Sequence, residues 1–280
     1  MSLADTYFID AVNTIINNGF SDENYKVRPV WPSDGTPAHT IKTFCYICRY
    51  DLSKEFPVLT LRKQFFKNAV KELLWMWQKK SNNINDLGLH IWDSWADEDG
   101  SIGATYGYQL GKKAKYSEGF VDQVDHLIYT LKNNPMDRRM ITTMWCPEDL
   151  HKMNLAPCVY ETLWDISDGK LNLTLMQRSG DLLAAAAPGS WDCIQYAVLQ
   201  TMLAQVCGYK PGEFVHIINN LHIYDMHLPI VKEIIKRPTF DAPKLWINPD
   251  ITNFYDFTVD DVKLVDYNSN PSDFKFEVAI

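Results

Sequence analysis

Leu171-Asn-Leu-Thr-Leu-Met-Gln177 is the stretch on which the fold assignment depends, because apolar and polar residues alternate along it from Leu171 to Leu175. An alternation with a period of two predicts a β-strand that is buried on one face. Residues 159–166, just before it, have the composition of a second strand. Residues 192–207, after it, form a long apolar run that ends at Gly208 and predicts a buried helix. These segments indicate a sheet with helices packed against it.

The rest of the chain mixes helices and strands in no regular order. Apolar spacing and composition predict further helices at residues 4–18, 63–79, 120–132 and 222–236. Further strands are expected at residues 43–50, 140–145, 213–218 and 274–279. Without regular βα alternation, the pattern favours an α+β fold around one large mixed sheet. No repeat or Gly/Ser-rich linker divides the chain, so residues 1–280 are expected to form a single domain.

The composition is that of a globular protein with an excess of acidic side chains. The 280 residues are 46% hydrophobic and carry a formal net charge of -8, which excludes disorder and argues against sequence-independent nucleic-acid binding. No run reaches the ~18 apolar residues of a membrane span, and the first residues do not resemble a secretory signal. We therefore expect a cytoplasmic protein without a membrane or polynucleotide partner. An anionic small molecule stays possible, because a local arginine cluster can outweigh the global charge.

Six scattered cysteines indicate a reducing compartment. Cys45 and Cys48 form a single CxxC without the second pair that a zinc site needs, so no metal site is predicted. Cys207 lies in the apolar run and is expected in the core. Cys158 follows a proline and opens the strand at 159–166. On composition alone it is either a core residue or a nucleophile.

Several short blocks carry a more specific signal. They are Asp34-Gly-Thr-Pro, Glu72-Leu-Leu-Trp75, His90-Ile-Trp-Asp-x-Trp95, Tyr106-Gly107, Arg138-Arg139, Leu155-Ala-Pro-Cys158, Gln177-Arg-Ser-x-Asp181 and His222-x-Tyr224. In this order and spacing they resemble the thymidylate synthase family, from about residue 10 to Ile280, and most of all its Bacillus-type branch. The resemblance implies a sheet-to-sheet homodimer that transfers a one-carbon unit from 5,10-methylenetetrahydrofolate to C5 of a pyrimidine nucleoside monophosphate.

The resemblance also implies the catalytic residues. Cys158 would be the nucleophile that adds to C6 of the pyrimidine and turns C5 into an enamine carbon, which is covalent catalysis. Arg178 would lower the pKa of that thiol and bind the phosphate. Glu72 would organise water and move protons at the position-4 edge of the base, and Tyr106 would assist proton removal from C5.

The remaining site residues bind the two ligands by the same resemblance. Nucleotide ligands would be Gln177, Arg178, Ser179, His222, Tyr224, and Arg138 and Arg139 reaching across the dimer interface. Folate contacts would be Ile91, Trp92, Trp95, Leu155, Asp181 and the C-terminal residues Ala279 and Ile280.

One departure from the family suggests a different base. The family has an asparagine before the long helix that bonds uracil N3–H and O4. Here the segment from Leu182 to Tyr196 is three residues longer, and it aligns Asp192 with that asparagine. An ionised aspartate offers only acceptors, which would suit cytosine and repel uracil O4. A second departure, Leu221 with no aspartate before His222, agrees. Both resemble cytidylate hydroxymethylases.

The sequence therefore favours a deoxycytidylate 5-hydroxymethylase, in which water captures the methylene intermediate. Three alternatives stay open. The first is a thymidylate synthase that acts on dUMP, and the second is a cytidylate C5-methylase. The third is an inactive relative that binds nucleotide or RNA, against which the presence of Cys158, Arg178 and Tyr106 argues.

Overall fold

A central seven-stranded sheet organises the structure, a computed structural model that describes residues 1–280. Its strand order is β1-β2-β9-β7-β6-β5, with β8 paired to β9. The strands are β1 (Phe20–Ser21), β2 (Thr40–Asp51), β5 (Ile141–Thr143), β6 (Val159–Ser167), β7 (Lys170–Gln177), β8 (Gly180–Asp181) and β9 (Lys210–Tyr224). Two small hairpins lie outside it, β3 (Ala114–Tyr116) with β4 (Gly119–Val121) and β10 (Lys244–Ile247) with β11 (Val262–Val265).

The helices surround this sheet. The α-helices are α1 (Leu3–Asn18), α2 (Phe66–Trp77), α3 (Ile84–Leu87), α4 (Gly107–Gly111), α5 (Gln123–Asn133), α6 (Trp191–Cys207) and α7 (Leu228–Ile234). Short 3₁₀ segments are η1 (His90–Trp95), η2 (Pro147–Lys152), η3 (Asp225–His227), η4 (Phe254–Asp256) and η5 (Val259–Asp261). No helix is long and apolar enough to cross a bilayer.

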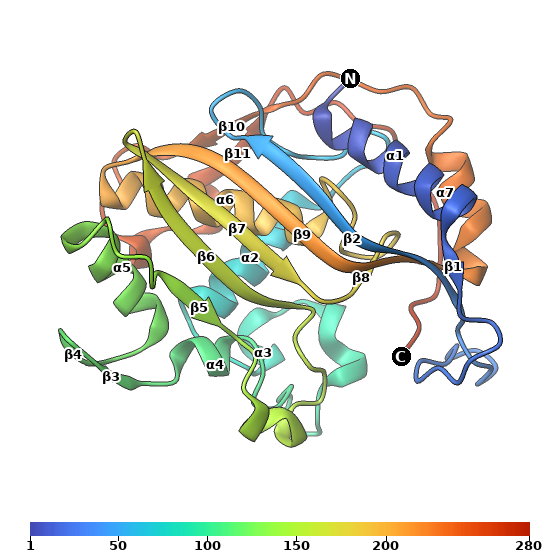
Figure 1. Cartoon of the computed structure of the whole chain (residues 1–280), viewed down its shortest axis with the longest axis horizontal. Helices are drawn as coiled ribbons and strands as arrows, with labels where there is room; N and C mark the ends of the chain where they lie inside the picture. Colours follow the sequence, from blue (N-terminus) through green and yellow to red (C-terminus); the bar gives the residue numbers. More distant parts are fainter.

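The sheet is mixed, as predicted. β7 and β8 run parallel to β9, and all other neighbours pair antiparallel. The alternating stretch is β7, which buries Leu171, Leu173 and Leu175 on one face. Against that face lies α6, which is buried over most of its length because it is covered on all sides. In Figure 1, α2 and α6 lie behind the sheet, and its front face shows no covering helix.

The uncovered face carries large apolar side chains on β2. Phe44 is 81% exposed and Ile47 is 48% exposed. Cys45 between them has a φ of 53° and is left out of the pairing with β9, so the ladder is interrupted at this residue without a change of register. An apolar sheet face in contact with water is characteristic of an interaction surface.

Two predicted elements are wrong, and most of the others are confirmed within a few residues. Residues 222–224 continue β9, and the helix starts only at Leu228, because strand pairing with β2 extends to Tyr224. Residues 274–279 form no strand, although Ile280 exchanges two backbone hydrogen bonds with Val30. The apolar residues there pack without an adjacent strand to complete a ladder.

Candidate active site

Cys158 lies where the loop after η2 enters β6. Its backbone N–H donates to the phenolic oxygen of Tyr106 at 3.0 Å. Tyr106 has a φ of 42° and a ψ of -104°, directly before the first residue of α4. A non-glycine residue is rarely held in this region of backbone space, and such strain persists only where the surroundings enforce it. Cys158 is thus attached to a strained turn.

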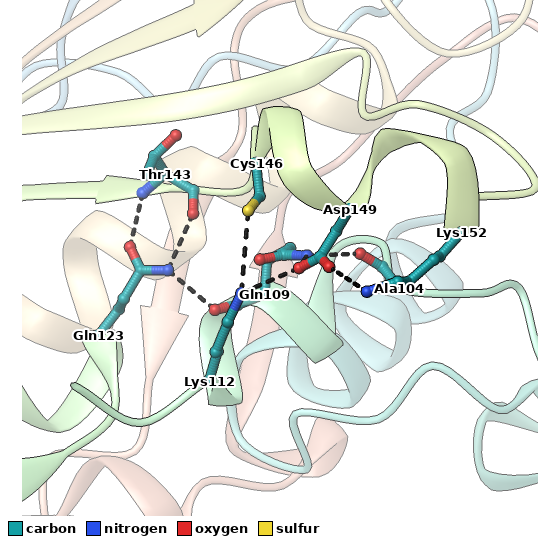
Figure 2. A network of polar contacts seen from close by, with 8 residues as sticks. All are labelled: Ala104, Gln109, Lys112, Gln123, Thr143, Cys146, Asp149 and Lys152. Carbon is teal, nitrogen blue, oxygen red and sulfur yellow. Dashed lines mark hydrogen bonds and ion pairs between the residues drawn. The ribbon is translucent and has the colours of Figure 1, made fainter.

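A polar network fixes that turn (Figure 2). Gln109 of α4 donates to the carbonyl of Ala104 at 2.8 Å and to Asp149 of η2 at 3.0 Å. The buried Asp149 also pairs with Lys112 at 2.9 Å and Lys152 at 2.8 Å. These hydrogen bonds lower the pKa of Asp149, so the carboxylate stays charged. The segment that contains Tyr106 and the segment that leads to Cys158 are therefore held together.

Arg178 is held next to the segment that leads into Cys158. Its guanidinium donates to the carbonyls of Pro157 at 2.9 Å and Ala156 at 2.8 Å, the two residues before Cys158. The charge of Arg178 lowers the pKa of the Cys158 thiol, as predicted, but it does not decide the net shift. Burial raises the pKa of Cys158, and although the charge of Arg178 opposes this, the charge of Asp192 adds to it. A buried thiolate costs more than one cation recovers here.

Arg28 is a site residue that the sequence analysis missed. It lies in the loop between β1 and β2, and its charge lowers the pKa of both Cys158 and Tyr224, against the larger effect of burial. The signal was weak, because residues 28–39 indicated only a Pro- and Gly-rich loop. The fold adds this second cation to Arg178.

Glu72 is buried and Asp192 is half-buried, and the charge of Glu72 acts on the Asp192 carboxyl group. Glu72 on α2 accepts hydrogen bonds from the indole N–H groups of Trp92 and Trp191 and from Gln195 Nε2 at 2.6 Å. Burial raises the pKa of Glu72, and the three donors oppose this. Burial and the nearby charge of Glu72 raise the pKa of Asp192 to about 7. Two carboxylates in one dry site do not both ionise readily.

Gln177 and His216 hold Asp192 in place through a chain of hydrogen bonds. Gln177 Nε2 donates to Asp192 Oδ2 at 2.8 Å, and Gln177 Oε1 lies 2.7 Å from His216 Nε2. Burial lowers the pKa of His216 to about 3, so its imidazole is neutral. A neutral imidazole that donates from Nε2 fixes the orientation of the Gln177 amide. His216 was not expected, since a lone histidine in an apolar strand carries no sequence signal.

Asp181, His222 and Tyr224 gather at the end of β9. The rings of His222 and Tyr224 lie 5.1 Å apart. Asp181 Oδ1 lies 3.7 Å from Nδ1 of the buried His227, another residue that the sequence analysis did not single out. Asp181 Oδ2 is buried without any hydrogen-bond partner. Such an atom is an acceptor available to a ligand.

The aromatic residues predicted to contact folate lie on η1. Trp92 packs at 5.7 Å from Trp95 and 5.4 Å from Tyr106, between ring centroids. Its N–H is directed to Glu72. Ile91 is 40% exposed, and Leu155 is half-buried on the loop to Cys158. At the C-terminus, Ala279 is buried against Trp31 and Ala38.

Two predicted nucleotide ligands stand apart. Arg138 and Arg139 are exposed on the turn between α5 and β5, where Arg139 pairs with Asp137 at 2.9 Å. No hydrogen bond or ion pair links either arginine to Cys158 or its neighbours. Ser179 is closer, since its carbonyl accepts from Gln177. No group of three His, Cys, Asp or Glu side chains gathers as a metal site would.

Known proteins match this arrangement over the whole chain. A family model described as thymidylate synthase matches residues 6–280. The chain belongs to the thymidylate synthase family. It is 51% identical to a thymidylate synthase of Bacillus licheniformis and 49% identical to thymidylate synthase 1 of Bacillus subtilis, in each case over 100% of both chains. The solved structure of thermostable thymidylate synthase A from Bacillus subtilis superposes with a TM-score of 0.92 at 48% identity, covering 99% of each chain.

These relatives overturn the hydroxymethylase prediction. Curated proteins that share about half of all residues with this chain over its full length are thymidylate synthases, and none of those named above is a hydroxymethylase. The prediction assumed that Asp192 is ionised. With Glu72 nearby its pKa is about 7, so the neutral acid, which offers one donor and one acceptor, is a major form near neutrality. The residue type therefore does not exclude uracil.

Proposed function

We propose that this protein is a thymidylate synthase that converts dUMP to dTMP with 5,10-methylenetetrahydrofolate. The observation that carries the proposal is the 51% identity, over the entire length of both chains, to a protein named thymidylate synthase. The arrangement around Cys158 supports it, because Tyr106 and Arg178 both lie next to this cysteine.

Cys158 starts the reaction by covalent addition. Its thiolate bonds to C6 of uracil, and the electron pair of the C5–C6 double bond moves to C5, which becomes nucleophilic. C5 bonds to the one-carbon unit of the folate, and loss of the C5 proton then breaks the bond between that carbon and tetrahydrofolate, which leaves an exocyclic methylene group on C5. A hydride from tetrahydrofolate reduces the methylene to a methyl group as the thiolate leaves C6, so the C5–C6 double bond is restored and the folate departs as dihydrofolate. Methylation is thus paired with two-electron oxidation of the folate.

The surrounding residues assist that chemistry at stated atoms. Arg178 and Arg28 supply positive charge near the thiol, which favours the thiolate and suits a phosphate dianion. Tyr106 presents its hydroxyl beside Cys158, where a proton leaving C5 would have to pass. Glu72, held by three donors in a closed pocket, is suited to organise water at the O4 edge of the base.

The residues around Asp181 fit a folate pterin. The unpartnered Asp181 Oδ2 can accept from a ring N–H, which would satisfy an otherwise costly buried oxygen. Trp95 on η1 and Leu155 on the loop before Cys158 would supply apolar surface for the pterin ring. The C-terminal residues pack on Trp31 and bond with Val30, which fits a role in excluding water.

A second copy of the chain completes the proposal. The exposed Phe44 and Ile47 on the uncovered sheet face would be buried in a sheet-to-sheet homodimer. Arg138 and Arg139, which have no partner in their own Cys158 site, would then serve the phosphate site of the other subunit. Within a single subunit these two arginines lie too far from the site to bind the nucleotide phosphate.

The test is a direct assay of purified protein with dUMP and methylenetetrahydrofolate. Production of dTMP with an absorbance rise from dihydrofolate is expected, and Cys158→Ser should abolish both. Cys207→Ser is a matched control that removes a thiol outside the site and should retain turnover. Consumption of dCMP in place of dUMP, or a modified base without dihydrofolate, would contradict the proposal.

A further inference from the structure

The two carboxyl groups of the site are unequal in their hydrogen bonds. Glu72 accepts from three N–H donors, those of Trp92, Trp191 and Gln195. The side chain of Asp192 accepts from one, Gln177, and only at Oδ2. Donors to a carboxylate stabilise its charged form. When the pair shares one proton, the proton therefore resides on Asp192, as in other carboxyl pairs whose environments differ.

The other groups around Asp192 either favour its protonation or are neutral. Glu72 faces it from α2 and raises its pKa, and Cys158 and Tyr106 are close enough for their own pKa values to be raised by it. Cys193 and Tyr196 on α6 are also affected by its charge and stay neutral. From β9, His216 acts only through Gln177 and is neutral.

Two features oppose protonation, and the first is the hydrogen bond from Gln177, which lowers the pKa of Asp192. Asp192 lies in the first turn of α6, where backbone N–H groups favour a negative charge. That effect is smaller than the cost of a second charge beside Glu72 in a site from which water is excluded. Arg178 and Arg28 act on Cys158, but neither contributes to the pKa of Asp192.

We propose that Asp192 must be protonated for the site to accept uracil, so that a neutral carboxyl group here does the work of an amide. Gln177 occupies Oδ2 as an acceptor, and Oδ1 makes no hydrogen bond within the protein. A neutral carboxyl group offers one O–H donor for uracil O4 and one carbonyl acceptor for uracil N3–H. The ionised group offers no donor and repels O4. This proposal rests on the proposed action on dUMP.

The pH dependence of dUMP use tests the proposal. For the wild type, kcat/KM with dUMP should fall about tenfold per pH unit above the pKa of Asp192, because only the neutral form binds uracil productively. The asparagine of Asp192→Asn cannot ionise, so the fall of kcat/KM at high pH should be absent in this variant. Asp250→Asn removes an exposed carboxylate outside the site and should show the same fall of kcat/KM as the wild type.

Equilibrium binding of dUMP gives a second measurement that does not depend on turnover. Glu72→Gln removes the neighbouring charge that raises the pKa of Asp192. The midpoint at which dUMP binding is lost should therefore move to lower pH in that variant. Lys71→Gln, on the same helix with its amine bonded to the carbonyl of Gly88, should leave the midpoint unchanged.

The outcomes separate this proposal from the proposed function. Turnover of dUMP with the same alkaline profile in the wild type and Asp192→Asn would overturn the role of Asp192 and leave the thymidylate synthase proposal intact. No turnover of dUMP at any pH, or preferred turnover of dCMP, would overturn the proposed function itself. If Asp192→Asn does not fold, an unchanged binding midpoint in Glu72→Gln overturns the role of Asp192.

Discussion

The hydroxyl of Tyr106 accepts a hydrogen bond of 3.0 Å from the backbone N–H of Cys158, and Tyr106 has a strained backbone with a φ of 42°. The relationship places a phenol beside the nucleophile and ties the nucleophile to a turn that cannot relax on its own. The position of the thiol therefore depends on residues that do not touch it.

Removal of the Tyr106 hydroxyl should impair catalysis more than folding. In Tyr106→Phe the hydrogen bond that helps to lower the pKa of Cys158 is lost, so burial raises that pKa further. We expect kcat to fall about a hundredfold, in the range of a lost proton-transfer group. Steady-state kinetics with dUMP measure it. Tyr108→Phe, 44% exposed on α4, is the control, and an equal loss in that variant would count against a specific role.

Neutralisation of Arg178 should suppress thiol reactivity. Its charge opposes the burial that raises the pKa of Cys158, so Arg178→Ala should raise this pKa further and reduce the thiolate fraction at neutral pH. Alkylation of Cys158 by iodoacetamide, followed against pH, should shift to higher pH. Arg49→Ala, which removes an exposed ion pair with Glu213, should not shift the curve. A wild-type alkylation profile in Arg178→Ala would contradict the assignment.

The network of Figure 2 should matter for both stability and rate. Asp149→Asn removes the carboxylate that pairs with Lys112 and Lys152, which should lower the free energy of unfolding. Because the turn at Tyr106 loosens, kcat should fall about tenfold with a smaller change in KM for dUMP. Urea unfolding and kinetics measure the two effects. Asp260→Asn breaks only an exposed pair with Lys67, and a loss of the same size there would argue against the network.

The carboxyl pair should make stability fall as pH rises. The pKa of Asp192 increases from 3.8 to about 7 on folding, so the folded state binds this proton more tightly, and the gain is lost as pH rises through about 7. The stability of Asp192→Asn relative to the wild type should therefore rise between about pH 4 and pH 7, by about 4 kcal/mol in total, and stay constant above that range. Unfolding at several pH values measures the difference. A difference that is constant with pH would show that Asp192 does not titrate on folding.

The elements that were predicted correctly are those with one dominant period. Residues 171–175 alternate strictly and lie in β7, and residues 192–207 are apolar throughout and form α6. The helix predicted at 222–236 was wrong because strand pairing carried β9 through His222 and Tyr224, and no local pattern reports how long a neighbouring strand is. Periodicity describes one segment, whereas pairing depends on two.

The residues of the site also fall into two groups, those that a local sequence block indicates and those that depend on how distant segments pack together. Cys158, Glu72 and Asp181 were predicted through short blocks that resemble those of the thymidylate synthase family. Arg28 and His216 were not singled out, because the charge of Arg28 acts on Cys158, and His216 lies against Gln177, only once segments far apart in the chain come together. The hydroxymethylase prediction failed for a related reason. The charge state of Asp192 depends on its distance from Glu72, which the sequence does not give.

The proposed reach of Arg138 and Arg139 across the dimer predicts complementation between two inactive variants. Cys158→Ser lacks the nucleophile, and Arg139→Ala should lack a phosphate ligand supplied to the other subunit. A mixed dimer then contains one intact site, built from Cys158 of one subunit and Arg139 of the other. Because half of randomly mixed dimers are mixed, co-refolding equal amounts should restore roughly one quarter of wild-type activity. If the arginine served its own subunit, both sites of the mixed dimer would be defective, and mixing would restore nothing beyond the residual activity of Arg139→Ala.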